Sequence, residues 1–282
     1  MTRGFRTGIL SVLAFATLLA PGARADNGGQ FSAKCDYTRT LFDDPIVHPR
    51  RPGMSHSHDF AGARKPNAFT TRFTLVRGGT TCERRADHSA YWMPTLYQRG
   101  RAVHARDFRV YYRSGGFNGR FVQPFPRGLR IIAGDAMRAD DDRPQPTTIA
   151  SWACTRPGQG PQGNEIEVPE VPRTCGGLPL RVRIVFPQCW DGRHLDAPDH
   201  KSHMAYAVAR MCPASHPVVL PQLTLSVRFW MADTGGLGLA SGGTHSLHAD
   251  FMPAWTGTAL EDLVRRCINA IVDCKRTGAG RA

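Results

Sequence analysis

Beyond its first 25 residues, the chain has no long apolar run. No later stretch approaches the roughly 20 apolar residues that a membrane-spanning helix needs, so we expect no membrane span. The chain also has no Cys-x-x-Cys pair, which argues against a zinc-thiolate site, and no Gly-x-Ser-x-Gly elbow, which gives a serine-nucleophile enzyme little support. We find no internal repeat, and no strand pattern is followed by a helical period of useful length, which disfavours an α/β fold.

The first 25 residues have the pattern of a secretory signal peptide. Arg3 and Arg6 precede an apolar run over residues 8–20, and Ala23-Arg24-Ala25 supplies the small residues of a cleavage site. We therefore expect a secreted protein, extracellular or periplasmic. Its expected parts are a signal peptide at 1–25, an N-terminal extension across the surface at 26–43, a single domain at 44–275 and a disordered tail at 276–282.

All eight cysteines follow the expected signal peptide, and an even number in an exported chain predicts disulfides. The formal net charge is +13, and loss of Arg3, Arg6 and Arg24 with the signal peptide leaves +10. A strongly basic exported protein is steered toward acidic polysaccharides, teichoic acids, lipopolysaccharide or anionic lipid, although solubility alone also explains the charge. No recognition helix or aromatic-basic motif appears, so we expect no nucleic-acid partner.

Short alternating apolar runs predict the strands. The clearest lies within residues 218–232, where Leu223, Leu225, Val227 and Phe229 alternate with polar residues. Further strands are expected at Phe73 and Leu75 and over the ranges 91–97, 103–110, 129–133 and 180–186. The fold class predicted is mainly β, with a β-sandwich or jelly-roll-like core and long disulfide-held loops.

One helix is predicted at the C-terminus. Thr258 and Glu261 have the spacing of a capping box, and an apolar stripe follows from Leu260 to Val272. The long polar passage before Pro172 predicts a surface insertion fastened by Cys154 and Cys175.

The candidate site residues gather in loops. The stretch 186–206, FPQCWDGRHLDAPDHKSHMAY, combines three aspartates and three histidines with turn-forming Asp-Gly and Ala-Pro-Asp sequences. His56 and His58 are two apart, a spacing that in an extended strand turns both imidazoles to one face. His248 and Asp250 repeat that spacing near the C-terminus. Tyr91, Trp92 and Tyr97 form an aromatic group that predicts either core or the wall of a ligand site.

Together these blocks resemble a secreted family catalogued as domain of unknown function 1996, found in fungi, often beside WSC domains, and in bacteria. The resemblance covers roughly residues 44–267. It rests on DPIV (44–47), SHSH (55–58), YWMPTLY (91–97), FPRGLRIIAGD (125–135), FPQCWDG (186–192), PDHKSHMAY (198–206), CPASHPV (212–218) and LHADF (247–251). The family carries no settled reaction. Its pattern implies these polar residues: His56, His58, Trp190, Asp191, Asp196, Asp199, His200, His203, Tyr206, His216, His248 and Asp250. It leaves out His88, His104, His194 and His245.

This set permits two kinds of site. In the first, a transition metal, zinc or copper, is bound by His56, His58, His248 and either His200 or His203, with Asp199 or Asp250 orienting an imidazole. In the second, the groups that cleave a glycan by acid–base chemistry are Asp196, Asp199, Asp250, His203 and Tyr206. Its ligand-binding walls are Tyr91, Trp92 and Trp190. Alternatively, these Asp and His side chains only tie loops together through hydrogen bonds.

From the sequence we expect a secreted protein that engages an extracellular or cell-wall polysaccharide through a His/Asp-rich pocket. Two classes stay open. In one, the protein is an enzyme, a hydrolase or lyase that cleaves the polysaccharide. In the other, it is a non-catalytic protein that binds glycan or metal.

Overall fold

Strands dominate the computed structural model, which describes the chain except for residues 2–27, 106, 156–165, 232 and 275–282. The expected signal peptide and C-terminal tail lie outside the described residues. The long strands are β1 (Gln30–Leu41), β2 (His58–Gly62), β3 (Ala90–Pro94), β6 (Asp107–Arg113), β7 (Ile131–Gly134), β8 (Ala150–Cys154), β9 (Leu180–Val185), β13 (Gln222–Phe229) and β15 (His248–Met252).

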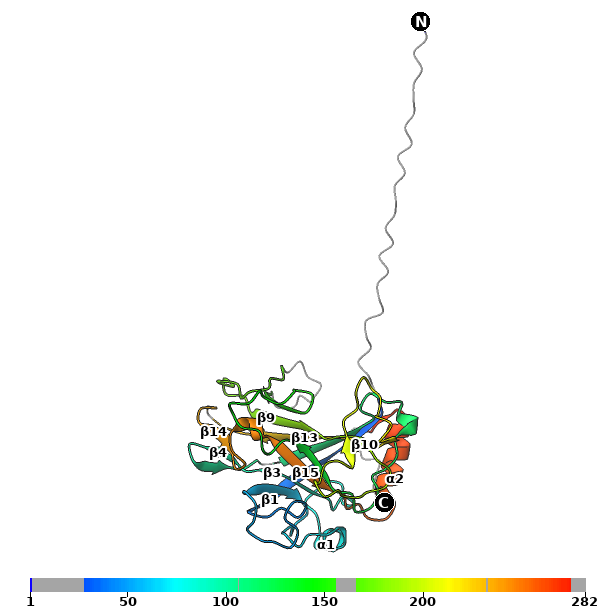
Figure 1. The fold of residues 1–282 in the computed structure, drawn as a ribbon, viewed down its shortest axis with the longest axis horizontal. Coiled ribbons are helices and arrows are strands. Elements are labelled where there is room, and N and C mark those ends of the chain that lie inside the picture. The colour runs from blue at the N-terminus through cyan, green and yellow to red at the C-terminus, as the bar shows by residue number, and fades with distance from the viewer. Residues whose placement is uncertain (2–27, 106, 156–165, 232, 275–282) are drawn as a thin grey trace.

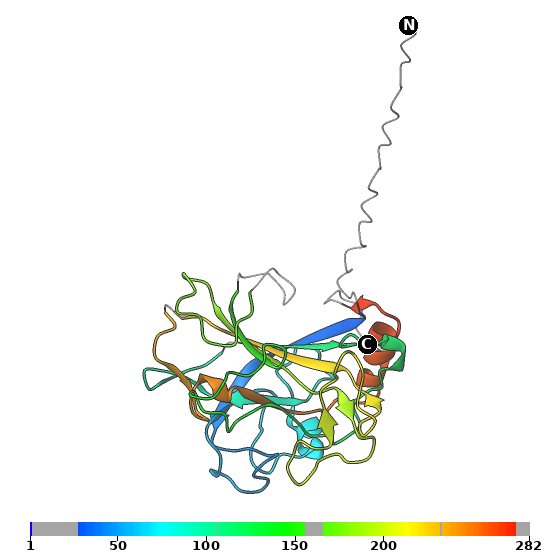
Figure 2. The same cartoon turned by 45° about the horizontal axis from the view of Figure 1, so that its top comes forward.

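These nine strands form one nearly closed antiparallel sheet, in the order β7-β15-β3-β2-β1-β6-β13-β9-β8. The twelve-residue β1 belongs to both halves, because residues 30–36 pair with β6 and residues 37–41 pair with β2, with a register shift between Tyr37 and Arg39. The shift bends the sheet, so its two halves face each other around the core (Figures 1 and 2). The predicted mainly β fold is confirmed.

Shorter elements complete the chain. Two three-stranded sheets have the orders β11-β10-β12 and β14-β4-β5, and β16 pairs in parallel with β1. Their bounds are β4 (Leu96–Gln98), β5 (Arg101–Val103), β10 (Cys189–Trp190), β11 (Met204–Ala205), β12 (Val218–Val219), β14 (Leu237–Leu239) and β16 (Asp273–Cys274). The helical elements are α1 (Arg72–Gly78), η1 (Gly119–Phe121), η2 (Thr244–Ser246), α2 (Ala259–Leu263) and η3 (Val264–Asn269).

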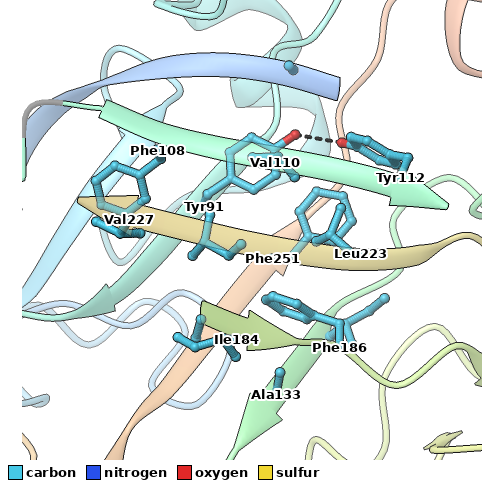
Figure 3. Packing of buried hydrophobic residues seen from close by; sticks show 14 of the residues in the cluster. Tyr91, Phe108, Val110, Tyr112, Ala133, Ile184, Phe186, Leu223, Val227 and Phe251 are labelled. Carbon is cyan, nitrogen blue, oxygen red and sulfur yellow. Dashed lines mark hydrogen bonds between the residues drawn. The ribbon is translucent and has the colours of Figure 1, made fainter. Parts of the chain in front are cut away.

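The main core lies between the two halves of the sheet. Phe251 on β15 packs against Tyr91 on β3, Phe125 and Phe186, and Leu223 and Val227 of β13 point into the same space (Figure 3). The alternation predicted for β13 is confirmed, since its four alternating apolar side chains are all buried. A second, smaller core lies on the other face of β2 and β3.

The N-terminal segment is placed differently from the prediction. Residues 26–43 were expected to lie across the surface, but β1 runs through the middle of the sheet between β2 and β6. Its polar side chains alternate with buried Phe31, Ala33 and Cys35, which reach the core. The passage before Pro172 likewise contains β8, an edge strand of the main sheet, and is therefore not a surface insertion throughout.

The helices also differ from the prediction. Phe73 and Leu75 lie in α1 and not in a strand, because Thr71 and Thr74 form a capping box that starts a helix there. The C-terminal helix is present, but the side chain of Thr258 bonds Asp262 and caps no backbone N–H, so the capping box predicted there is wrong. The helix ends near Asn269, before Val272.

Four disulfides hold the loops, as the cysteine count predicted. The bonded pairs are Cys35–Cys82, Cys154–Cys175, Cys189–Cys212 and Cys267–Cys274. Each pair joins cysteines that follow one another in the sequence, and the Cys154–Cys175 pair confirms the expected fastening. No helix within the described residues is long and apolar enough to cross a membrane.

Candidate metal centre

Three histidines from two distant parts of the chain meet beside the smaller core. His58 begins β2 and His248 begins β15, and these strands are separated by β3 alone in the sheet. His56 lies two residues before His58 in the loop that enters β2. The sheet order therefore brings together side chains that are 190 residues apart in the sequence.

The imidazoles converge through their Nε2 atoms. The Nε2 atom of His248 lies 3.3 Å from that of His56 and 3.5 Å from that of His58. His58 and His248 are buried, while His56 is partly exposed and lies on the solvent side of the group. The imidazoles of His56 and His58, which are two residues apart in the sequence, lie on the same face, as their spacing predicted.

Backbone carbonyls set the tautomers of the two buried rings. The Nδ1 atom of His58 donates to the carbonyl oxygen of Asp43 over 3.0 Å, and that of His248 donates to the carbonyl of Ser246 over 2.8 Å. A carbonyl can only accept, so Nδ1 carries the proton in each neutral ring and Nε2 is left with a lone pair. Two lone pairs therefore face each other across 3.5 Å.

Protonation does not remove this conflict near neutral pH. Burial, reinforced by the neighbouring imidazoles, lowers the pKa of His58 and of His248 to about 3. The pKa of His56 is also lowered, first by burial and then by His48, although Asp44 acts in the opposite direction. All three rings are thus neutral, the form in which imidazole binds a metal ion.

Two buried carboxylates border the same space. Oxygen atoms of Asp44 and Asp250 and a nitrogen of His58 lie within 4.8 Å of one another. One oxygen of Asp44 accepts the N–H groups of Ile46 and Val47 at 2.8 and 2.9 Å. Asp250 is 1% exposed, and neither of its oxygens has a hydrogen-bond partner among the described residues.

The environment of Asp250 disfavours its charged form. Burial raises the pKa of this carboxyl well above its usual range, nearby Asp44 raises it further, and the Lys201 ammonium acts in the opposite direction. A buried carboxyl without a partner is costly, and a cation beside it would remove that cost. Asp250 is therefore the side chain that most needs a ligand in this site.

A tight glycine position holds β7 against the centre. Gly134 pairs with His248 across the sheet and has a φ of +82°. A Cβ atom there would lie 2.4 Å from the carbonyl oxygen of Leu247 and 2.9 Å from the Cα of His248. Only glycine lets the two strands come this close beside the histidine.

The structure does not bring His200 or His203 into this group. His200 Nδ1 contacts Asp196 at 2.9 Å, and Asp196 also pairs with Arg130 at 3.0 Å. The Nε2 atom of His203 contacts the carbonyl oxygen of Arg130 at 2.7 Å. These bonds fasten the 186–206 loop to the segment that leads into β7.

The other residues predicted for acid–base work also have structural partners. Asp199 is exposed and accepts the backbone N–H groups of Lys201 and Ser202, which lower its pKa to about 2. The Tyr206 hydroxyl donates to the carbonyl of Val185 at 2.9 Å. Of the predicted acid–base set, only Asp250 lies at the histidine group, and the hydrogen bonds of the others match the loop-fastening alternative.

The predicted aromatic wall does not face a ligand. Tyr91 and Trp92 are fully buried, with Tyr91 bonded to Asp87 and Trp92 stacked on Phe60. They belong to the two cores, the other outcome that the sequence allowed. Trp190 is partly buried and donates its Nε1 hydrogen to the carbonyl of His194.

Asp44 is the residue of this group that the sequence reasoning missed. Asp44 opens the DPIV motif, but its role depends on β15 approaching β2, which no local pattern shows. The adjacent pair Asp43-Asp44 at the start of a histidine-bearing loop was the available signal. A further cluster, Cys35, Cys82 and Asp87, offers no thiolate because its cysteines are bonded to each other.

Comparison with known proteins identifies one relationship. The model of a family described as "Domain of unknown function (DUF1996)" matches residues 44–255, which include every residue of the histidine and carboxylate group. A search of curated proteins and a search of solved structures each returned no match.

Proposed function

The chain belongs to the family described as Domain of unknown function (DUF1996), which assigns no activity, so we propose a function from the site's geometry. The protein binds one transition-metal ion through His56, His58 and His248, with Asp250 and Asp44 as carboxylate ligands. The metal centre serves the cleavage of an extracellular or cell-wall polysaccharide by a hydrolase or lyase reaction. Export of the protein is part of this proposal.

The observation that carries the proposal is the meeting of two imidazole lone pairs. His58 and His248 are both neutral and both donate from Nδ1, so neither ring supplies a proton to bridge their Nε2 atoms. A metal ion between them would turn a repulsive contact into two bonds. The backbone carbonyls of Asp43 and Ser246 would then orient the two metal-bound rings by accepting their Nδ1 hydrogens, an arrangement common in metal-binding proteins.

The spacing of the nitrogens suits zinc. An ion about 2.0–2.1 Å from two nitrogens at tetrahedral angles holds those nitrogens about 3.3–3.4 Å apart. The separations of 3.3 and 3.5 Å agree with this value. Imidazoles also suit copper, which stays the alternative ion.

The donor set also suits catalysis. Such an ion polarises a bound oxygen and lowers the pKa of bound water, which supplies a nucleophile or base at neutral pH. An oxygen of Asp250 lies within 4.8 Å of a ring nitrogen of His58, so this carboxylate would accept a proton or complete the ligand set. His56 is the partly exposed ligand, so substrate would approach from its side.

The polysaccharide class follows from charge. The formal net charge of +10, which remains after loss of Arg3, Arg6 and Arg24 with the signal peptide, favours an acidic polysaccharide over a neutral one, because a basic protein concentrates polyanions near its surface. A second candidate function is metal binding without catalysis. The deep burial of His58, His248 and Asp250, at 0%, 3% and 1% exposure, favours that candidate.

Assays with the zinc-loaded and chelated protein on acidic and neutral polysaccharides separate the two functions. Cleavage by the loaded protein that is lost on chelation and in His248→Ala, but kept in the exposed control His194→Ala, supports the enzyme. Metal uptake with no cleavage of any polysaccharide would favour the non-catalytic function. Cleavage that survives both chelation and His248→Ala would contradict a metal-dependent reaction.

A further inference from the structure

We propose that the surface formed by residues 42–77, named here the 42–77 surface, docks on an anionic lipid surface. This segment runs from the end of β1 into α1, and its parts outside β2 lie at the bottom of Figure 1. Its loops expose large apolar side chains. Phe42 is 58% exposed, Met54 50% and Phe69 55%.

One buried carboxylate, that of Asp43, holds together the loop positions that carry these three side chains. Asp43 accepts the N–H of Gly53 with one oxygen and the N–H of Ala68 with the other, both at 2.9 Å. Phe42, Met54 and Phe69 each directly precede or follow one of these three residues in the sequence. The apolar side chains are therefore carried by a fixed loop assembly, which holds them out to solvent.

Further backbone bonds make this assembly rigid. Ser55 donates to the carbonyl of Phe42 at 3.1 Å, and Arg50 donates to the carbonyl of Ala68 at 2.7 Å. A rigid apolar patch loses little conformational entropy when it is covered. Exposed apolar patches rimmed by polar residues are typical of partner or membrane contacts.

The charge of the 42–77 surface has a single sign. Its three carboxylates, Asp43, Asp44 and Asp59, are buried at 7%, 3% and 2% exposure. All of its exposed charged side chains are basic, namely Arg50, Arg51, Arg64, Lys65 and Arg77. None of these five has an ion pair within the described part of the chain. A partner of complementary charge would therefore be anionic.

The apolar side chains favour lipid over polysaccharide. Phenylalanine and methionine have no polar group to bond sugar hydroxyls, unlike the tryptophan and tyrosine that serve at wet interfaces. An anionic bilayer offers phosphates to guanidinium groups and an apolar region just below them. Phe73, 61% exposed, is a fourth exposed apolar side chain in this segment, with the Arg77 guanidinium 3.8 Å from its ring centroid.

This surface is continuous with the candidate metal centre, because the same loop carries Asp44, His56 and His58. Docking would place that loop beside the lipid headgroups. The inference itself does not depend on the metal, since none of Phe42, Met54 and Phe69 belongs to the histidine and carboxylate group.

The test is sedimentation of the exported protein with vesicles of phosphatidylglycerol or of phosphatidylcholine. We expect binding to phosphatidylglycerol that weakens with salt and is at least about tenfold weaker on phosphatidylcholine. The variant Phe42→Ser/Met54→Ser/Phe69→Ser should lose at least about tenfold in binding. Arg50→Gln/Arg51→Gln should lose binding while keeping every apolar side chain. The matched control Val208→Ser/Met211→Ser, at a different exposed loop, should bind as the unchanged protein does.

Three results would overturn the inference. The first is the absence of sedimentation with phosphatidylglycerol. The second is binding by both variants of the surface that equals the binding of the unchanged protein. The third is binding to soluble polygalacturonate without vesicle binding, which would assign the surface to an acidic polysaccharide. Near-ultraviolet circular dichroism shows whether each variant keeps its fold, and the arginine variant tests the inference even if the triple variant does not.

Discussion

The Nε2 atoms of His58 and His248 lie 3.5 Å apart in the protein interior, although the Nδ1 atom of each ring is committed to a backbone carbonyl. Neither ring can donate to the other, and burial keeps both uncharged. A cation between the two rings would remove this unfavourable contact. The predictions below follow from that conflict and from the carboxylates beside it.

Asp250→Asn should stabilise the metal-free protein and weaken metal binding. The folded carboxyl has a raised pKa, so folding at neutral pH costs free energy that a neutral amide avoids. We expect a gain of about 1–3 kcal/mol in the free energy of unfolding with chelator present. Metal affinity should fall by at least about tenfold. Thermal unfolding and a metal titration measure the two effects, and a variant that is less stable without metal would contradict the reasoning.

The stability of the chelated protein should fall as the pH falls from 6.5 to about 3. The folded pKa of His58 and of His248 is about 3, so over this window the unfolded chain takes up two protons that the folded chain does not. Asp250 acts in the opposite direction above pH 3.8, because its folded carboxyl keeps a proton that the unfolded one loses. These three side chains together contribute a slope of one proton, about 1.4 kcal/mol per pH unit, and His56, whose pKa is also lowered, adds to it in the same direction.

Urea unfolding at several pH values measures this slope. In Asp250→Asn the opposing contribution is gone, so the slope should exceed that of the unchanged protein by about one proton, about 1.4 kcal/mol per pH unit. A flat profile for the chelated protein between pH 4 and 6 would mean that the histidines are not buried as neutral rings.

Gly134→Ala should damage both the fold and the centre. The added Cβ would lie 2.4 Å from the carbonyl oxygen of Leu247, and the φ of +82° suits alanine poorly. We expect a loss of about 2 kcal/mol or more in the free energy of unfolding, together with weaker metal binding. Gly53→Ala is the matched control. Its φ is +75° but no atom lies near its Cβ position, so it should cost less and leave metal binding intact.

His200→Ala should leave the metal content unchanged. This side chain bonds Asp196 and stands apart from the three converging imidazoles. Loss of its hydrogen bond should lower the free energy of unfolding by about 0.5–1.5 kcal/mol. Elemental analysis beside a urea titration checks both expectations. Loss of metal as complete as that in His248→Ala would show that the 186–206 loop supplies a ligand.

The alternation of apolar and polar residues in the sequence predicted those strands that bury one face in the core. The alternation in β13 predicted a strand because its apolar residues all reach the core. The same reasoning failed for β1, whose outward side chains are charged or polar and whose second half is only partly buried. It also failed for α1, where apolar spacing two apart suggested a strand and the Thr71–Thr74 capping box decided for a helix.

The site could be predicted only in part, for a related reason. The two-residue spacing of His56 and His58, and of His248 and Asp250, identified the two segments of the chain that supply the site. Their meeting depends on the order β15-β3-β2, a long-range property that residue spacing does not contain. The 186–206 stretch is the richest in histidine and aspartate, yet most of its polar side chains bond within the loop or to the Arg130 segment.

The central claim is that His56, His58 and His248 form one metal site, and elemental analysis tests it most directly. The protein would be exported with its disulfides intact and dialysed against a weak chelator. His58→Ala/His248→Ala and the exposed control His194→Ala would be treated alike. The account predicts close to one zinc or copper ion per chain in the unchanged protein and in His194→Ala, and none in the double variant. Metal-free protein that also fails to take up added zinc or copper, or a double variant that keeps its metal, would contradict it.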